Sequence, residues 1–407
     1  ALLDTRIWVQ ALYRDYTGQV PPVAEPPPVA LVQIDTASIS RSGISKVQPI
    51  DRSYLAQIVD RLTELNTPLI GLDFVLDTPQ AQDKTLAKAI QTAVSQNGTW
   101  FVFAAILDTS GEIGVNSATG IASPNWSLQG HIDADPHYVM LPYPNEDCRH
   151  ICPFAHLLAL VHTAQRYPPN VPLPQPQLNH QQDLRLHFLN TIDAHRSPTH
   201  PLTPLRKLHL SPLSVWVYDQ WGQHWLEPII DFSIPADRVY DRIPAWQLLE
   251  TDQLDTERLS QQIVLIAPGD DERMGLSPGK PDRFPIPAAL RYWNSQYWLT
   301  GSESLAYMMH HQLTQRLVIP IPDLWMVVAI VLLGKSVSLW LNNQTNQRQW
   351  TRQQHRVYIA GLTGLTTFYG LVSLQLYISS SLLLPWLLPS ALLWAYLLPA
   401  FRSSTNA

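Results

Sequence analysis

The sequence contains little charge. Charged residues make up 15% of its 407 positions, and 27 basic residues against 33 acidic ones give a net charge of -6. Nucleic-acid binding requires a concentrated basic surface, and the first 320 residues contain no such cluster. We therefore expect no nucleic-acid partner. The 35 prolines are well above the average usage of ~5% and predict long ordered loops and several linkers.

The sequence also lacks a recognisable secretory signal peptide. Its first 20 residues, ALLDTRIWVQALYRDYTGQV, contain no basic start followed by an apolar run and a small-residue cleavage site. Residues 2–16 predict a short amphipathic helix, and residues 21–28 (PPVAEPPP) predict a stiff extended linker. Because an exported domain needs a targeting segment, we expect this chain to be part of a longer protein in which a membrane helix precedes it.

The C-terminal quarter differs from the rest because three long apolar stretches follow one another. Residues 324–341 contain one charge, and residues 357–378 and 381–401 contain none. Each approaches the ~20 residues that a helix needs to cross a bilayer. Tryptophans near the ends of these stretches are typical of an aromatic belt, which favours membrane helices over a buried helical hairpin. We predict a three-helix transmembrane bundle within residues 321–407.

The basic residues predict the orientation of these helices. The link between the first two stretches holds Arg348, Arg352 and Arg356 and no acid, so we expect it to be cytoplasmic. Everything before residue 324 then lies outside the cytoplasm. Lys335 agrees with this orientation, because its side chain would extend toward the cytoplasmic face.

The preceding residues alternate between β-rich and helical patterns. Strands are predicted at residues 29–35, 68–74, 99–107 and 262–268, and helices at residues 51–65, 83–96, 151–165 and 302–317. Right-handed crossovers of this kind build a parallel sheet. The fold class is therefore α/β, a mainly parallel sheet flanked by helices. We expect residues 29–320 to form this domain and residues 108–261 to be a large insertion with strands and helices of its own.

Several of these segments resemble a known family. They are VALVQIDTASI, PIDRSYLAQIVDRL, PLIGLDFVLD, IVLIAPGDD and LAYMMHHQL, in that order and followed by the three apolar stretches. In this order they resemble the type 2 cyclase/histidine-kinase-associated sensory extracellular (CHASE) domain. The resemblance implies an extracytoplasmic sensor that controls an intracellular cyclase, kinase or diguanylate cyclase. It implies no particular ligand and no cofactor. Many relatives have a Trp-Pro pair where this chain has VQPID.

Four acids form a candidate ligand site. Asp35 ends the first predicted strand, Asp73 lies near the end of the second, and Asp77 and Asp83 follow. Ligands bind at the carboxyl edge of open α/β sheets, so these carboxylates would suit a cation or a polar small molecule. The alternative, which we favour, is that they cap helices and fix turns.

Cys148 and Cys152 are the two cysteines of the chain. In an oxidising compartment a pair this close in sequence is expected to form a disulfide. The alternative adds His150 and makes a metal or redox site. A metal site needs further ligands from elsewhere, and the C-x-x-C spacing of redox motifs is absent. We favour the disulfide and predict no metal.

The segment GLSPG matches the G-x-S-x-G motif of serine hydrolases around Ser277, with Asp282 and His310 following in hydrolase order. A true nucleophile lies on a sharp turn between a strand and a helix. Here seven residues separate the preceding strand from the motif, and Pro278 opposes a helix directly after the serine. We interpret the match as accidental and expect no catalytic activity.

His310 and His311 lie in the predicted helix just before the first apolar stretch. They could carry a pH or metal signal into the membrane, since histidine titrates near neutral pH. An ordinary helix with one packed and one exposed histidine is the favoured alternative. The helix is nevertheless where we expect coupling to occur.

The sequence therefore predicts the sensory domain of a multi-pass receptor in a bacterial inner membrane. Its expected partners are a small-molecule or periplasmic ligand, the lipid bilayer and a cytoplasmic output domain in the same protein. A homodimer is plausible, although no heptad pattern requires one. The alternatives are a membrane-anchored periplasmic hydrolase built around Ser277, or a periplasmic scaffold subunit.

Overall fold

The structure is a computed structural model that divides the chain into two units. One, which we call the α/β unit, comprises residues 20–209 and 230–317, and the other, the helical unit, comprises residues 1–19, 210–229 and 318–407. The structure describes residues 2–22, 26–44, 47–109, 111–133, 135–142, 148–166, 173–179, 181–194, 228–251, 255–277, 280–345 and 352–403.

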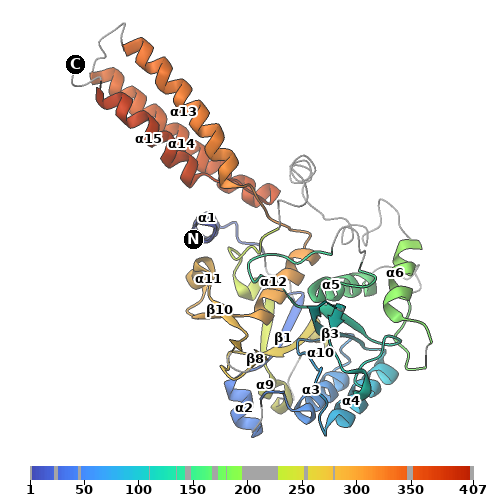
Figure 1. The fold of residues 1–407 in the computed structure, drawn as a ribbon. Coiled ribbons are helices and arrows are strands. Elements are labelled where there is room, and N and C mark those ends of the chain that lie inside the picture. Colours follow the sequence, from blue (N-terminus) through green and yellow to red (C-terminus); the bar gives the residue numbers. More distant parts are fainter. Residues whose placement is uncertain are drawn as a thin grey trace. The chain divides into compact units, whose positions relative to one another are not determined.

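A mainly parallel sheet forms the core of the α/β unit (Figure 1). Within the described residues its seven strands are β1 (Val29–Ile34), β2 (Leu69–Leu72), β3 (Trp100–Asp108), β4 (Gly111–Ile113), β5 (Leu128–His131), β6 (Tyr240–Pro244) and β7 (Ile263–Pro268). The order is β4-β3-β2-β7-β1-β6, with β5 also paired to β3. Only β4 runs antiparallel to its neighbour. Every residue of β1, β2 and β7 is buried, as parallel strands covered on both faces require.

Helices cover both faces of this sheet (Figure 1). One face packs on α2 (Thr36–Ser42), α3 (Arg52–Glu64), α4 (Asp83–Asn97), α9 (Ala245–Glu250) and α10 (Thr256–Ser260). The other packs on α5 (Phe154–Gln165) and α12 (Gly301–Leu313). Alternation along β1 explains the division. Ala30, Val32 and Ile34 join the cluster of the first face, and Gln33 bonds to residues at the start of α12.

Helix α12 runs antiparallel to the strands. At its start the Ser302 hydroxyl donates to the carbonyl of Pro268, at the carboxyl end of β7. Further along, the Tyr307 ring packs 6.2 Å from that of Tyr240, at the amino end of β6. The helix therefore spans the sheet from its carboxyl edge to its amino edge. All its residues from Ser302 to Gln312 are buried.

The predicted core elements agree with the structure to within a few residues. Residues 108–261 were predicted to be a large insertion with strands and helices of its own. The structure places β4, β5 and β6 from this segment in the main sheet, and α5 covers one of its faces. The segment also contains α6 (Leu184–Ala194). Residues 195–227 of the segment lie outside the described part of the chain.

Between β7 and α12 the chain forms short hairpins. Strand β8 (Gly275–Ser277) pairs with β9 (Lys280–Pro281), and β10 (Arg283–Pro285) pairs with β11 (Trp298–Thr300). The short helix α11 (Ala288–Trp293) connects β10 to β11.

The helical unit contains α1 (Leu2–Thr17), α13 (Asp323–Thr345), α14 (Arg352–Ser380) and α15 (Leu387–Ser403). Strand β12 (Ile319–Pro320) precedes α13 and pairs with β13 (Leu382–Leu383), which lies between α14 and α15. In the described part of the chain, one helical segment, Arg356–Ser380, is long and apolar enough to cross a bilayer. A shorter apolar segment, Leu387–Leu398, lies in α15.

A buried polar face joins α1 to the rest of the helical unit. Arg6, Gln10 and Arg14 recur every four residues on one side of α1 and are almost fully buried. The Arg6 guanidinium donates to the Leu383 carbonyl at 2.8 Å and pairs with Asp323 at 3.4 Å. The helix predicted at residues 2–16 is thus present, and it buries these polar side chains together with Ile7 and Ala11.

The central position of β1 makes a direct test possible. Leu31 is fully buried in this strand, so Leu31→Ala should lower the unfolding free energy by about 3 kcal/mol, through lost burial and the cavity left behind. The matched change Leu186→Ala, at a partly exposed position of α6, should cost less than about 1 kcal/mol. Urea unfolding of the detergent-solubilised chain measures both. Equal costs would contradict the central placement of β1.

Candidate functional site

The carboxyl edge of the sheet is the candidate ligand site, because ligands of open α/β sheets bind there. Asp35 directly follows β1 and lies at this edge. Its carboxylate accepts the backbone N–H of Ser38 at 2.7 Å and the Ser38 hydroxyl at 2.6 Å, and so caps α2. Gly269 packs against it so closely that a Cβ there would lie 2.9 Å from the Asp35 Cα. These contacts give Asp35 a structural role.

Two other predicted acids also have local roles. Asp83 is buried in the first turn of α4, where it pairs with the buried Arg52 at 3.2 Å and accepts the backbone N–H of Gln80 at 2.7 Å. Asp77 is exposed, and its carboxylate accepts the Thr78 hydroxyl at 3.0 Å. The alternative of caps and turns therefore describes Asp35 and Asp83.

Asp73 behaves differently from the other three. It follows β2, its side chain is 6% exposed, and its Oδ2 atom has no hydrogen-bond partner among the described residues. Burial raises its pKa well above the ordinary value, and the nearby Asp282 carboxylate raises it further. Burial also raises the pKa of Asp282 to about 6. Two carboxylates in a poorly hydrated place favour retention of a proton between them.

Asp282 of this pair lies at the start of α12. Gly301 is the first residue of that helix, and a Cβ there would overlap the carboxylate of Asp282, so only glycine fits. The Gly301 backbone N–H points to the Asp282 carbonyl at 3.4 Å. Any change in the charge of the pair therefore acts directly on the first turn of α12.

Other polar groups hold the same turn. Thr300 and Glu303 form a capping box, with the Thr300 N–H donating to the Glu303 carboxylate at 2.8 Å. Gln33 donates to the hydroxyls of Thr300 and Ser302 at 3.3 and 3.4 Å. The Glu303 carboxylate also accepts the Tyr240 hydroxyl at 2.7 Å and pairs with Arg242, both on β6.

These residues were not predicted as site residues. Gln33 gave a usable signal, because it interrupts the otherwise apolar strand VALVQI. Asp282 was considered only as a partner of Ser277. Asp282 and Asp73 lie far apart in the sequence, so no local pattern predicts that they approach each other.

An open cavity of about 300 Å³ lies among the helices α2, α3 and α9, beside the carboxyl edge of the sheet. It is formed by the end of α2, the first turns of α3 and the helix α9. Helices α2 and α9 directly follow the neighbouring parallel strands β1 and β6. At its wall, burial raises the pKa of Tyr54 to about 12, so this hydroxyl stays protonated.

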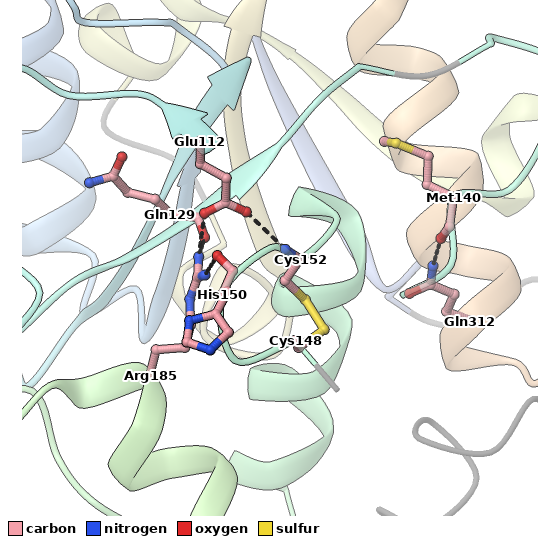
Figure 2. Close-up of a disulfide and its surroundings, with 8 residues drawn as sticks. All are labelled: Glu112, Gln129, Met140, Cys148, His150, Cys152, Arg185 and Gln312. Atoms are coloured by element: carbon pink, nitrogen blue, oxygen red, sulfur yellow. Dashed lines mark hydrogen bonds and ion pairs between the residues drawn. A yellow bond between two sulfur atoms is a disulfide. The ribbon is translucent and has the colours of Figure 1, made fainter. Parts of the chain in front are cut away.

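The structure joins Cys148 and Cys152 in a disulfide with a Cα–Cα distance of 4.5 Å, in agreement with the predicted pairing (Figure 2). The Cys152 N–H donates to the Glu112 carboxylate at 2.8 Å. Arg185 of α6 pairs with Glu112 at 2.9 Å and donates to the His150 carbonyl at 2.8 Å. The disulfide thus belongs to a structural network, and the described residues contain no cluster that could hold a metal.

The serine-hydrolase motif has the wrong surroundings. Ser277 ends β8, which pairs antiparallel with β9 in a short hairpin. A nucleophile elbow leads from a strand into a helix, and a hairpin does not provide that turn.

His310 and His311 are both buried in α12. Burial lowers the pKa of His310 to about 4, so it is neutral near pH 7. His311 Nε2 accepts the backbone N–H of Asp231 at 2.9 Å, which occupies the lone pair that a metal would need. Asp231 in turn pairs with Arg316 at 3.4 Å. The two histidines therefore pack at the end of α12, and the hydrogen bond accepted by His311 opposes metal binding there.

The fold defines a class of protein, an α/β domain with a mainly parallel sheet that is continuous in sequence with apolar helices. A family model for the CHASE2 domain matches residues 1–340, and the chain belongs to that family. CHASE2 is a family of extracytoplasmic sensory domains of membrane signalling receptors, and its members are sensory rather than catalytic. No curated protein and no solved structure matches the chain.

The acid pair predicts a pH-dependent stability. In the folded chain the pKa of Asp73 is raised well above its usual range and that of Asp282 is about 6. The folded state therefore binds protons more tightly than the unfolded chain. The pair's contribution to the unfolding free energy is greatest below about pH 4 and falls as the pH rises through about 6.

Asp73→Asn should remove part of this loss of stability at higher pH. The unfolding free energy should then depend less steeply on pH. We expect an effect on the order of 1–2 kcal/mol near neutral pH. Urea unfolding on both sides of the pKa of Asp282 measures it. The control is Asp77→Asn, an exposed acid of the same segment, which should leave the slope unchanged. A wild-type slope in Asp73→Asn would show that the pair does not share a proton.

Proposed function

We propose that this chain is the extracytoplasmic input domain of a bacterial transmembrane receptor. The α/β unit binds a small-molecule or periplasmic ligand, and the helical unit passes the signal through a multi-pass segment of the plasma membrane to a cytoplasmic output module of the kinase or cyclase type. The observation that carries this proposal is α12. It starts at the candidate ligand edge and continues through β12 into α13, the first apolar helix.

We further propose that α13, α14 and α15 all cross the bilayer. Segment Arg356–Ser380 has the required length and hydropathy. On α13, Leu324, Val328 and Leu332 recur every four residues and are 53–70% exposed, and Phe368 on α14 is also exposed. Exposed apolar surface of this kind is typical of lipid contact. Positive charge at Arg352 and Arg356 favours a cytoplasmic link between the first two helices.

The proposed mechanism is a shift between two packings of α12. A ligand changes such an equilibrium only by its difference in affinity for the two states. The hydrogen bonds at the start of α12 stabilise one position of the helix. A bound ligand can favour or oppose that position. Symmetric pairing of two receptors would transmit the same shift, and we propose a homodimer as the working assembly.

Thiol labelling of intact cells tests the topology. In a background without Cys148 and Cys152, a cysteine at the exposed Ser40 should react with a membrane-impermeant reagent, and one at Gln349, between α13 and α14, should not. Lysed cells, in which both positions should react, are the control. Labelling at Gln349 alone would place the α/β unit in the cytoplasm and overturn the proposal.

Glu303→Gln tests the role of α12. The change weakens the hold of Tyr240 and Arg242 on the first turn of the helix. In the full-length receptor it should shift basal output at least about fivefold, which corresponds to about 1 kcal/mol of coupling. Arg149→Gln, which breaks a partly exposed ion pair with Asp193 in the same unit and away from β6, is the control and should leave output unchanged.

Normal output from a folded Glu303→Gln receptor, verified by its thermal unfolding, would contradict transmission through α12.

A further inference from the structure

The cavity of about 300 Å³ between α2, α3 and α9 carries charges of both signs. Arg41, at the end of α2, supplies the positive charge. Asp51, before α3, and Glu250, at the end of α9, supply two negative charges. A ligand with only one kind of charge would leave part of this lining without a complement.

The contacts of Arg41 leave its guanidinium able to bind a ligand. Its guanidinium lies 3.8 Å above the centre of the Trp246 ring, and one N–H group donates to Glu250 at 3.0 Å. Stacking on the indole fixes the plane of the guanidinium, whose fork of donors matches a carboxylate. Both charged side chains are about half exposed, so their ion pair contributes little and a ligand can open it at small cost.

The acids complement an ammonium group. One oxygen of Asp51 accepts the Ser53 N–H at 2.7 Å as the cap of α3, and a carboxylate offers about four acceptor positions in total. Glu250 adds a second carboxylate, which loses its cation partner when a ligand's carboxylate takes Arg41. The two acids together then exceed the remaining positive charge and attract a cation.

The size and lining of the cavity further limit which ligands can fit. About 300 Å³ lies at the lower end of small-molecule sites. Ile44, Leu249 and Trp246 provide an apolar part of the wall beside the charged groups. A small molecule with two opposite charges and a modest apolar group fits this combination.

We propose that the cavity binds a small zwitterion of the α-amino-acid type, with its carboxylate on Arg41 and its ammonium group on Asp51 and Glu250. This inference names the ligand class of the sensory function proposed above and rests on it. Binding itself can be measured without any output module, so the two proposals fail separately.

Isothermal titration calorimetry of the detergent-purified chain with the twenty common α-amino acids tests the site. At least one should bind. Its N-acetyl derivative, which lacks the ammonium group, and its carboxamide, which lacks the carboxylate, should each bind at least about tenfold more weakly. This series needs no variant, so no folding defect can obscure its result. Failure of all twenty to bind would overturn the proposal.

Two variants then assign the contacts. Arg41→Gln should weaken binding of the amino acid at least about tenfold and abolish its advantage over the carboxamide. Asp51→Asn combined with Glu250→Gln should abolish the advantage over the N-acetyl derivative, and asparagine preserves the cap of α3. Arg149→Gln, which breaks a partly exposed ion pair with Asp193 away from the cavity, is the matched control and should bind as the wild type does.

Each contrary result has a definite meaning. Undiminished binding in Arg41→Gln would overturn the site, and so would binding of an uncharged sugar in place of every amino acid. Amino-acid binding that never changes output in the full-length receptor would overturn the receptor function and leave the site standing.

Discussion

The pairing of β7 between β1 and β2 is the constraint on which the rest of the α/β unit depends. Strand β7 arrives long after the other two in sequence, yet it pairs in parallel with both, and all three strands are fully buried. Without it, β1 and β2 have no common neighbour, and their carboxyl ends do not form one edge. Asp73 and Asp35, which follow β2 and β1, come to the same edge only through this long-range contact.

The same pairing fixes α12. Ser302 bonds to the last residue of β7, and Gln33 of β1 bonds to Thr300 and Ser302. Buried apolar contacts alone would allow a helix to slide, because they have no direction. Directed hydrogen bonds from two adjacent strands specify its register, and a carboxylate pair of raised pKa lies against its first residue. The start of α12 is thus held by hydrogen bonds from two strands and lies against Asp282, a buried acid of raised pKa.

Much of this fold could be predicted from the sequence, because fully buried parallel strands appear as short apolar runs between amphipathic helices. Strand β6 (Tyr240–Pro244) was missed, since it lies at the edge of the described sheet and contains charged residues and a proline. The acids at the edge left two interpretations open, a ligand site or caps and turns. Sequence places Asp35 and Asp83 correctly, but it cannot distinguish a free carboxylate from one occupied by a cap or by Arg52. The approach of Asp282 to Gly301 depends on tertiary structure alone.

The edge position of β6 offers a physical route from the cavity to α12. Trp246, which holds Arg41, lies in α9 directly after β6, and β6 pairs with one neighbour, β1, in the described sheet. An edge strand can shift without breaking the β2-β7-β1 core, because half of its hydrogen-bonding groups face no strand. Arg242 on β6 holds Glu303 of α12. In the proposed receptor, a ligand that separates Arg41 from Glu250 would change the contacts of α9, and β6 would carry that change to α12, which precedes the apolar helices in sequence.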